Sequence, residues 1–179
     1  MDFKGVLHPF RVVQLAYVVT ELEAACQTFR ELYGIGPFFR SPTHALPNVR
    51  YRGSPTEPVV IDVAFAQSGD MNIELVAQIS PGPSAFREMY AEGEQGLHHV
   101  AVFASDYAAD HQALIDAGHE EVMDLRRGDD CRICFIDARP TLGHMIELYT
   151  DHPLLRHLYA FVRKETERWN GKDLILPLG

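Results

Sequence analysis

The sequence predicts an α+β fold in which two βαβββ modules pair in one domain around a cleft, with an added C-terminal helix. The order of one strand, one helix and three strands occurs twice along the chain. Shifting the first half by 85 residues places Gln14 on His99. Insertions in the first half change this offset later in the chain, where Glu74 and Glu147 fall at the same point in the last strand of each half. Each half is too small to bury its own sheet, so the two sheets should face each other in a single domain.

The first module is expected at about residues 11–79. Apolar residues at helical spacing follow Thr20, and Gly34 ends them, so a capped amphipathic helix is predicted between these two positions. Residues 41–57 are rich in proline and form a connection long enough to cover a site. The predicted strands are 11–19, a short one at Phe38 and Phe39, and a hairpin of 59–67 and 72–78 with its turn at 68–70.

The second module is expected at about residues 96–150, after one or two helical turns at 85–91. Its helix follows Ser105 and Asp106 and ends near Gly118. Its strands are predicted at 97–104, near 120–125, at 131–137 and at 144–150, with turns at 126–130 and 140–143.

The third region, residues 151–179, completes the predicted single domain of residues 1–179. Residues 152–170 should form a helix with one apolar side, followed by an apolar tail at 174–178. Such a tail must cover either its own sheet or a second subunit. A homodimer is therefore expected.

The composition excludes several classes of protein. The chain has 179 residues, 46% of them hydrophobic, which suffices for a core. Its formal charge of −9 and the lack of a basic run argue against nucleic-acid binding. No apolar run is long enough to span a membrane, and residues 1–4 do not begin a signal peptide, so a cytoplasmic location is expected.

The three cysteines fit reduced thiols better than a disulfide framework. Cys131 and Cys134 form a C-x-x-C pattern, which is compatible with zinc or redox chemistry. The pattern lies in a predicted strand, however, where residues three apart point to opposite faces. Both cysteines are therefore interpreted as structural.

Four polar residues interrupt apolar strands. They are Gln14, Glu74, His99 and Glu147. Burying such groups without partners costs several kcal/mol, so they are expected to meet around a cation. Strand alternation places His98 and His99 on opposite faces, and the alignment of Gln14 with His99 selects His99 for the cleft. His98 is then expected on the helix side, as a supporting or packing residue. The alternatives for single residues are an edge-strand amide, a solvent-facing carboxylate or a satisfied core histidine.

The donor set of amide oxygen, imidazole nitrogen and carboxylate oxygens suits one divalent metal ion, either Zn, Ni, Co, Mn or Mg. It lacks the thiolates of a closed structural zinc site. The metal is therefore expected to be catalytic, with positions open to the oxygens of a substrate. A carbonyl or thioester held there would be polarised, and a proton beside it would become removable by a nearby carboxylate.

The chain resembles the vicinal oxygen chelate superfamily, also called the glyoxalase/bleomycin resistance/dioxygenase superfamily. The resemblance covers residues 11–150 and rests on the duplicated strands, two Ile-Glu-Leu segments and the Gly-Leu-His-His-Val entry to the second half. The segment joining the modules is most similar to that of methylmalonyl-CoA epimerases. In this superfamily the ligands come from the first and last strands of each module. The resemblance thus implies Gln14, Glu74, His99 and Glu147 as metal ligands.

The resemblance also implies catalytic roles. Epimerases usually carry His at the position of Gln14 and Gln at that of Glu74, whereas the set found in this chain is that of some lactoylglutathione lyases. By resemblance Glu147 is the main base, with Glu74 or Asp62 as the base opposite. For Asp62 the alternative is a capping or edge aspartate, since a register error of one residue would turn it away.

Four residues in or near the proline-containing connection are candidate substrate contacts. Arg40 and Arg50 could meet an anionic tail such as a CoA phosphate, and Tyr51 and Phe38 could pack on a ring or acyl chain. The alternatives are arginines that solvate a loop and aromatic rings that pack in the core.

The expected function is that of a metal-dependent epimerase or isomerase, which abstracts a proton next to a metal-bound carbonyl or acyl thioester of a small-molecule substrate. One alternative is a glutathione-dependent lyase similar to lactoylglutathione lyase. Another is a non-catalytic protein that binds a hydrophobic or antibiotic-like molecule. An extradiol dioxygenase needs two histidines and one carboxylate around iron, and Gln14 argues against it.

Overall fold

The computed structural model describes residues 10–128 and 130–179. The segment at residues 1–4, on which the expectation about a signal peptide rests, lies outside this part of the chain. Among the described residues, no helix combines the length and the apolar character that crossing a bilayer requires.

Both modules have the order of elements that the duplicated pattern predicted, and the fold is α+β. The first module comprises β1 (Val12–Val18), α1 (Leu22–Tyr33), β2 (Phe38–Ala45), β5 (Val60–Ser68) and β6 (Met71–Gln78). After α2 (Ala85–Met89), the second module comprises β7 (Gly96–Phe103), α3 (Tyr107–Asp116), β8 (Glu120–Arg127), β9 (Cys131–Asp137) and β10 (Met145–Tyr149).

The helix ends follow from local chemistry. Asp106 caps α3, because its carboxylate accepts hydrogen bonds from the backbone N–H groups of Ala108 and Ala109. Gly34 ends α1 in the left-handed conformation, with φ of 71°. A side chain at Gly34 would disfavour that conformation, so the position suits glycine.

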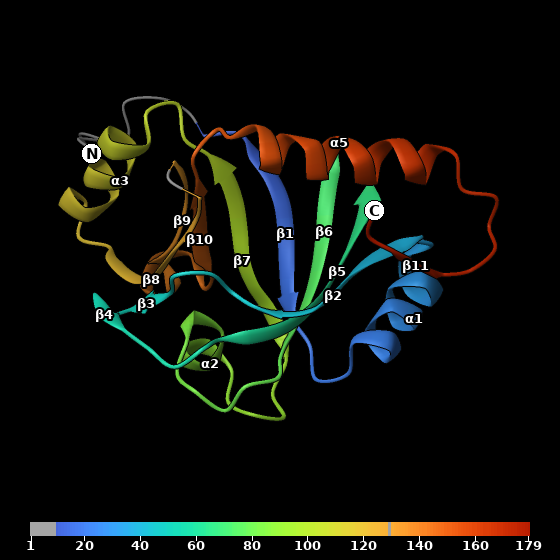
Figure 1. Ribbon diagram of the computed structural model, residues 1–179, viewed down its shortest axis with the longest axis horizontal. Coiled ribbons are helices and arrows are strands. Elements are labelled where there is room, and N and C mark those ends of the chain that lie inside the picture. Colours follow the sequence, from blue (N-terminus) through green and yellow to red (C-terminus); the bar gives the residue numbers. More distant parts are fainter. Residues whose placement is uncertain (1–9, 129) are drawn as a thin grey trace.

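The strands form one continuous curved sheet, in the order β11-β2-β5-β6-β1-β7-β10-β9-β8-β3-β4. The modules join where β1 pairs antiparallel with β7 (Figure 1). The expected pair of separate sheets is therefore fused at its centre. The physical reason is that β1 and β7 are the edge strands of their modules, and each supplies hydrogen-bond partners for the other.

The two faces of this sheet have different neighbours. Helix α1 packs on the outer face of the first module and α3 on that of the second. Helix α5 (Pro153–Glu167), which was expected at residues 152–170, places Leu155 and Val162 in the core on the concave face. Figure 1 shows α5 lying across the ends of the central strands, with α1 and α3 farther out. The concave face is thus the one that can enclose a ligand.

The proline-containing connection is more ordered than a loop. Strand β2 continues to Ala45, and the short strands β3 (Arg50–Tyr51) and β4 (Ser54–Pro55) follow. Strand β3 pairs with β8, so the connection crosses from the first module to the far edge of the second. The turn predicted at residues 140–143 lies largely in the single helical turn α4 (Arg139–Leu142).

The apolar tail adds β11 (Ile175–Pro177) to its own sheet, parallel to β2. The backbone N–H of Leu178 also donates a hydrogen bond to the carbonyl of Arg40. Of the two predicted uses of the tail, covering its own sheet is therefore the observed one. The tail no longer supplies a reason to expect a homodimer.

Candidate metal centre and active site

Polar side chains from four neighbouring strands meet at the centre of the concave face. Ala16 lies between Glu74 and His99 in the sheet, and Ala101 lies between Gln14 and Glu147. The predicted ligands are thus two pairs related by the internal repeat, each pair separated by an alanine. Because alanine is small, the polar groups have room to converge above it.

Three of the four predicted ligands form a compact cluster. The Nε2 atom of His99 lies 3.0 Å from a carboxylate oxygen of Glu147 and 3.9 Å from one of Glu74. One ligand atom from each residue lies within 4.8 Å of the other two, and all three residues are buried. The cluster joins the last strands of both modules to the first strand of the second module.

A β-bulge places His98 beside His99. Ala16 pairs with His99 and Tyr17 with Leu97, which leaves His98 as an extra residue in β7. The Nδ1 atoms of the two histidines lie 2.9 Å apart. The prediction that His98 points toward the outer helices is therefore wrong, because alternation fails at a bulge. Its predicted role as a support for His99 agrees with this contact.

The contact between the histidines determines which nitrogen of His99 is free. Burial lowers the pKa of His98 to about 3, so its ring is neutral at neutral pH. Its Nε2–H donates to the carbonyl of Ala85, which leaves Nδ1 of His98 as an acceptor. His99 must therefore donate through Nδ1–H, and its Nε2 atom is the one that faces Glu74 and Glu147.

The surroundings of His99 Nε2 fit a divalent cation. This buried atom has no aligned hydrogen-bond partner among the described residues, although two carboxylates lie close to it. Burial alone would lower the pKa of His99, but the charges of Glu147 and Glu74 outweigh it and raise the pKa. A cation would take the place of the Nε2 proton and satisfy all three ligands.

Gln14, the fourth predicted ligand, lies beside the cluster but has protein partners. Its amide nitrogen donates to Asn72 at 2.9 Å, and its oxygen accepts from the hydroxyl of Tyr149 at 3.1 Å. The same hydroxyl lies 2.5 Å from a carboxylate oxygen of Glu147. Tyr149 therefore connects Gln14 to Glu147. It lies two residues after Glu147, so strand alternation places both side chains on the same face. The sequence analysis did not predict this contact.

A cavity of about 370 Å³ opens above the cluster, with Glu74 and Glu147 in its wall. This volume lies within the range of small-molecule sites. Both modules, α5 and the C-terminal tail contribute to the wall. Its apolar side chains include Ile61, Val63, Phe65, Phe86, Leu125, Ile133, Phe135, Leu158 and Phe161. Its other polar side chains are those of Ser41, His44, Arg127, Tyr149 and His157.

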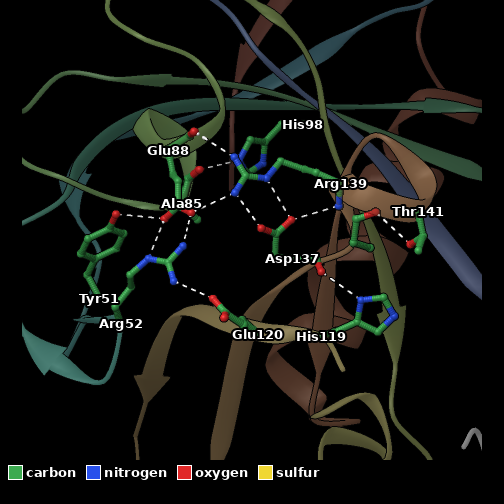
Figure 2. A network of polar contacts seen from close by, with 11 residues as sticks. Tyr51, Arg52, Ala85, Glu88, His98, His119, Glu120, Asp137, Arg139 and Thr141 are labelled. Atoms are coloured by element: carbon green, nitrogen blue, oxygen red, sulfur yellow. Dashed lines mark hydrogen bonds and ion pairs between the residues drawn. The ribbon is translucent and has the colours of Figure 1, made fainter. Parts of the chain in front are cut away.

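A network of ion pairs holds α2 in position (Figure 2). The carboxylate of Glu88 pairs with Arg52, from the segment between β3 and β4, and with Arg139 of α4 at 2.9 Å. Arg139 also pairs with Asp137 at 2.6 Å. Ala85 begins α2, and its carbonyl accepts the hydrogen bond from His98, so the network that holds α2 also supports the orientation of His98.

Asp62 does not reach the cavity, so its proposed role as a base is not supported. Ile61 and Val63 line the cavity, and alternation turns Asp62 to the opposite face of β5. There its carboxylate pairs with Arg40 at 2.5 Å. The register differs by one residue from that required for a base, which leaves Glu74 as the only one of the two candidates beside Glu147.

The four predicted substrate contacts are also absent from the cavity wall. Arg40 pairs with Asp62 and with Glu23 of α1 on the outer face. Arg50 pairs in register with Asp124 and lines a separate outer cavity. Phe38 packs in the outer core beside α1, and the hydroxyl of Tyr51 donates to Glu88 at 2.9 Å. These positions give no support to the prediction that the four residues contact a substrate in this cavity.

Glu74 should make the stability of the metal-free protein depend on pH. Burial, with a smaller contribution from Glu147, raises the pKa of Glu74 from 4.5 to about 7 despite the opposing effect of His99. Between these values the folded state retains a proton that the unfolded chain releases, so stability falls as the pH rises. Glu74→Gln should therefore stabilise the metal-free protein by about 3 kcal/mol at pH 8, and by little at pH 4.5.

Urea unfolding of metal-stripped protein across this range measures the effect. Glu31→Gln, at an exposed position of α1, is the matched control and should show no such trend. With saturating metal, the unaltered protein should be more stable than Glu74→Gln, since a metal that binds the folded state stabilises it. A Glu74→Gln effect that does not vary with pH would contradict the assignment.

Comparisons with known proteins agree with this architecture. The profile of the family described as "Glyoxalase/Bleomycin resistance protein/Dioxygenase superfamily" matches residues 13–135. A Bacillus subtilis protein, "Uncharacterized protein YqjC", is 33% identical over 91 residues. That alignment covers 49% of this chain and 64% of the relative, which is less than two thirds of its length.

Solved structures with the same fold include methylmalonyl-CoA epimerases. The enzyme from Mycobacterium tuberculosis is 19% identical, with a TM-score of 0.52 over 82% of this chain and 91% of the other. An epimerase in complex with methylmalonyl-CoA and NH4+ is 23% identical, with a TM-score of 0.51 over 82% and 97%. A hypothetical protein from Bacillus halodurans C-125 is 14% identical, with a TM-score of 0.55 over 81% and 96%. At these identities the likeness shows the fold alone.

Proposed function

Because this chain belongs to the glyoxalase/bleomycin resistance protein/dioxygenase superfamily, we propose that it is a metal-dependent epimerase or isomerase, which moves a proton next to a substrate carbonyl. One observation carries the proposal. Two buried carboxylates, Glu74 and Glu147, flank the free nitrogen of His99 in the wall of a mainly apolar cavity. Such a pair can remove a proton from one side of a carbon atom and return it from the other.

Glu74, His99 and Glu147 would hold the cation, with Gln14 beside them. When bound, a divalent cation draws electron density from a carbonyl oxygen and acidifies the neighbouring C–H group. Glu147 would accept the proton, while the Tyr149 hydroxyl keeps its carboxylate oriented. Glu74, on the other side of His99 Nε2, would return a proton from the opposite side of the carbon atom.

The cavity wall indicates the substrate class. Phe65, Phe135 and Phe161 offer apolar surface on which an acyl group can pack. The polar groups outside the cluster include Arg127 and His44, which can bind an anionic or polar part of the same molecule. We therefore propose a carbonyl compound or acyl thioester with a short apolar chain.

Proton exchange in heavy water tests this function. The metal-loaded protein is incubated with methylmalonyl-CoA, and deuterium incorporation beside the thioester is followed by NMR. We expect exchange and epimerisation that a chelator abolishes and that added divalent metal restores. Exchange that survives complete removal of the metal would contradict the metal-dependent part of the proposal.

A second function, that of a glutathione-dependent lyase, is favoured by the types of ligand. The set of Gln14, Glu74, His99 and Glu147 matches that of some lactoylglutathione lyases, by the resemblance stated above. The hemithioacetal of methylglyoxal and glutathione is the discriminating substrate. Turnover of this compound without exchange of methylmalonyl-CoA would select the lyase. Tight binding of an apolar ligand to metal-stripped protein, without turnover of either compound, would select the non-catalytic binding protein.

A further inference from the structure

A second group of potential metal ligands lies on the outer face of the second module. His111 comes from α3, Glu121 from β8 and Cys134 from β9. One ligand atom from each lies within 4.8 Å of the other two. The Nε2 atom of His111 is 2.7 Å from a carboxylate oxygen of Glu121. This group faces away from the central cavity, because Cys134 packs in the core beneath α3.

We propose that His111, Glu121 and Cys134 form a second binding site, for a borderline divalent cation such as Zn²⁺. Nitrogen, oxygen and sulfur ligands from three separate elements are the combination that zinc prefers. Around a zinc ion such atoms lie ~3.3–3.6 Å apart. The observed separations therefore require only small movements of side chains.

The neighbouring residues can complete this site. Asp124 pairs directly with Cys134 across the two strands, so the side chains share a face. A cavity of about 460 Å³ lies against the group and is lined by His111, Glu121 and Asp124. Asp124 or a water molecule could therefore be the fourth ligand. The ring of Tyr107 stacks on that of His111, with an angle of 13° between the planes, and restricts its orientation.

Positively charged side chains near the site repel cations, so a cation can bind there only by direct coordination to the ligands. Arg50, Arg126 and Arg132 also line the outer cavity, so its overall charge does not attract a cation. The thiol of Cys134 is buried, and a metal that binds its sulfur must replace the thiol proton. A thiophilic metal can displace that proton, whereas Mg²⁺ or Ca²⁺ cannot gain from the sulfur. Selectivity for borderline metals follows.

Cobalt titration distinguishes this site from the central one. Bonds between thiolate sulfur and Co²⁺ absorb in the near ultraviolet, and the central cluster of Glu74, His99 and Glu147 contains no sulfur. Metal-stripped protein is titrated with Co²⁺ at stoichiometric concentrations. We expect this absorption to saturate at one equivalent per chain in His99→Ala, which removes a central ligand, and at no more than two equivalents in the unaltered protein, where the central cluster also takes up Co²⁺. Failure of the central site would therefore leave the result unchanged.

Variants assign the signal to residues. Cys134→Ser should abolish the absorption, while Cys26→Ser and Cys131→Ser, at the other two buried free cysteines, should retain it. His111→Ala removes a partly exposed ligand without opening the core, and should weaken Co²⁺ binding by at least the ~10–100-fold that loss of a supporting contact costs. Absence of the band in the unaltered protein would overturn the proposal. Persistence of the band in Cys134→Ser, or undiminished affinity in His111→Ala, would also do so.

Discussion

Replacement of Glu147 by glutamine should lower the rate of epimerisation by ~10²–10⁴-fold, the usual contribution of a general base. Glutamine has nearly the same shape and still offers an oxygen to a cation, but its amide cannot accept the proton. The Tyr149 hydroxyl, 2.5 Å from the Glu147 carboxylate, would keep an acceptor oxygen in place. Rates on methylmalonyl-CoA, measured together with metal content, separate loss of the base from loss of the metal.

The stereochemistry of exchange makes this prediction sharper. Glu147 and Glu74 should each exchange protons on one side of the substrate α-carbon. The Glu147→Gln variant should therefore still exchange the α-proton of one enantiomer through Glu74. Glu74→Gln should preserve exchange of the other enantiomer. Asp62→Asn, which alters a carboxylate outside the cavity, is the matched control and should leave the rate unchanged. A Glu147→Gln variant with more than a tenth of the original rate would rule out Glu147 as the main base.

Replacement of His99 by alanine should reduce bound metal by close to one equivalent per chain. The imidazole supplies the only nitrogen ligand of the central cluster, and without it two carboxylates would face each other across an empty space. Elemental analysis after dialysis against a metal buffer measures the loss. His157→Ala is the matched control, because His157 lines the same cavity but lies outside the cluster.

His98→Phe should have an intermediate effect. Phenylalanine fills the space of the ring but cannot accept the hydrogen bond from His99 Nδ1, which fixes the free nitrogen of His99. Loss of a contact of this type costs ~10–100-fold in metal affinity. If both His98→Phe and His99→Ala retain the metal, a cation in this protein must be held elsewhere.

Much of the fold follows from patterns that are local in the sequence. Alternating apolar residues, helical spacing and the internal repeat predicted both modules, and the fold class is confirmed. The same patterns predicted that Cys131 and Cys134 lie on opposite faces, and they belong to separate cores on the two sides of the sheet. Local sequence determines these features because side chains alternate in every regular strand, whatever lies around it.

The predictions that the structure does not support concern which side chains point into the cavity. Asp62 was expected at the site, and a shift of one position in register places it on the outer face of β5. Arg50 was expected in a loop, and the structure places it in β3, which pairs with β8. His98 was expected on the helix side, and a bulge turns its ring toward His99. Helix α5 and the tail cover the cavity, although they are distant in the sequence from most of the strands that line it.

The sequence by itself therefore determined the repeated architecture and identified the buried polar residues that call for partners, because burial of an unpaired polar group is costly in any fold. Only the tertiary structure decided which of these residues share one centre. Register, the bulge in β7 and the pairing of β1 with β7 determine the distances between side chains. These arise from contacts between strands, which no single stretch of sequence specifies.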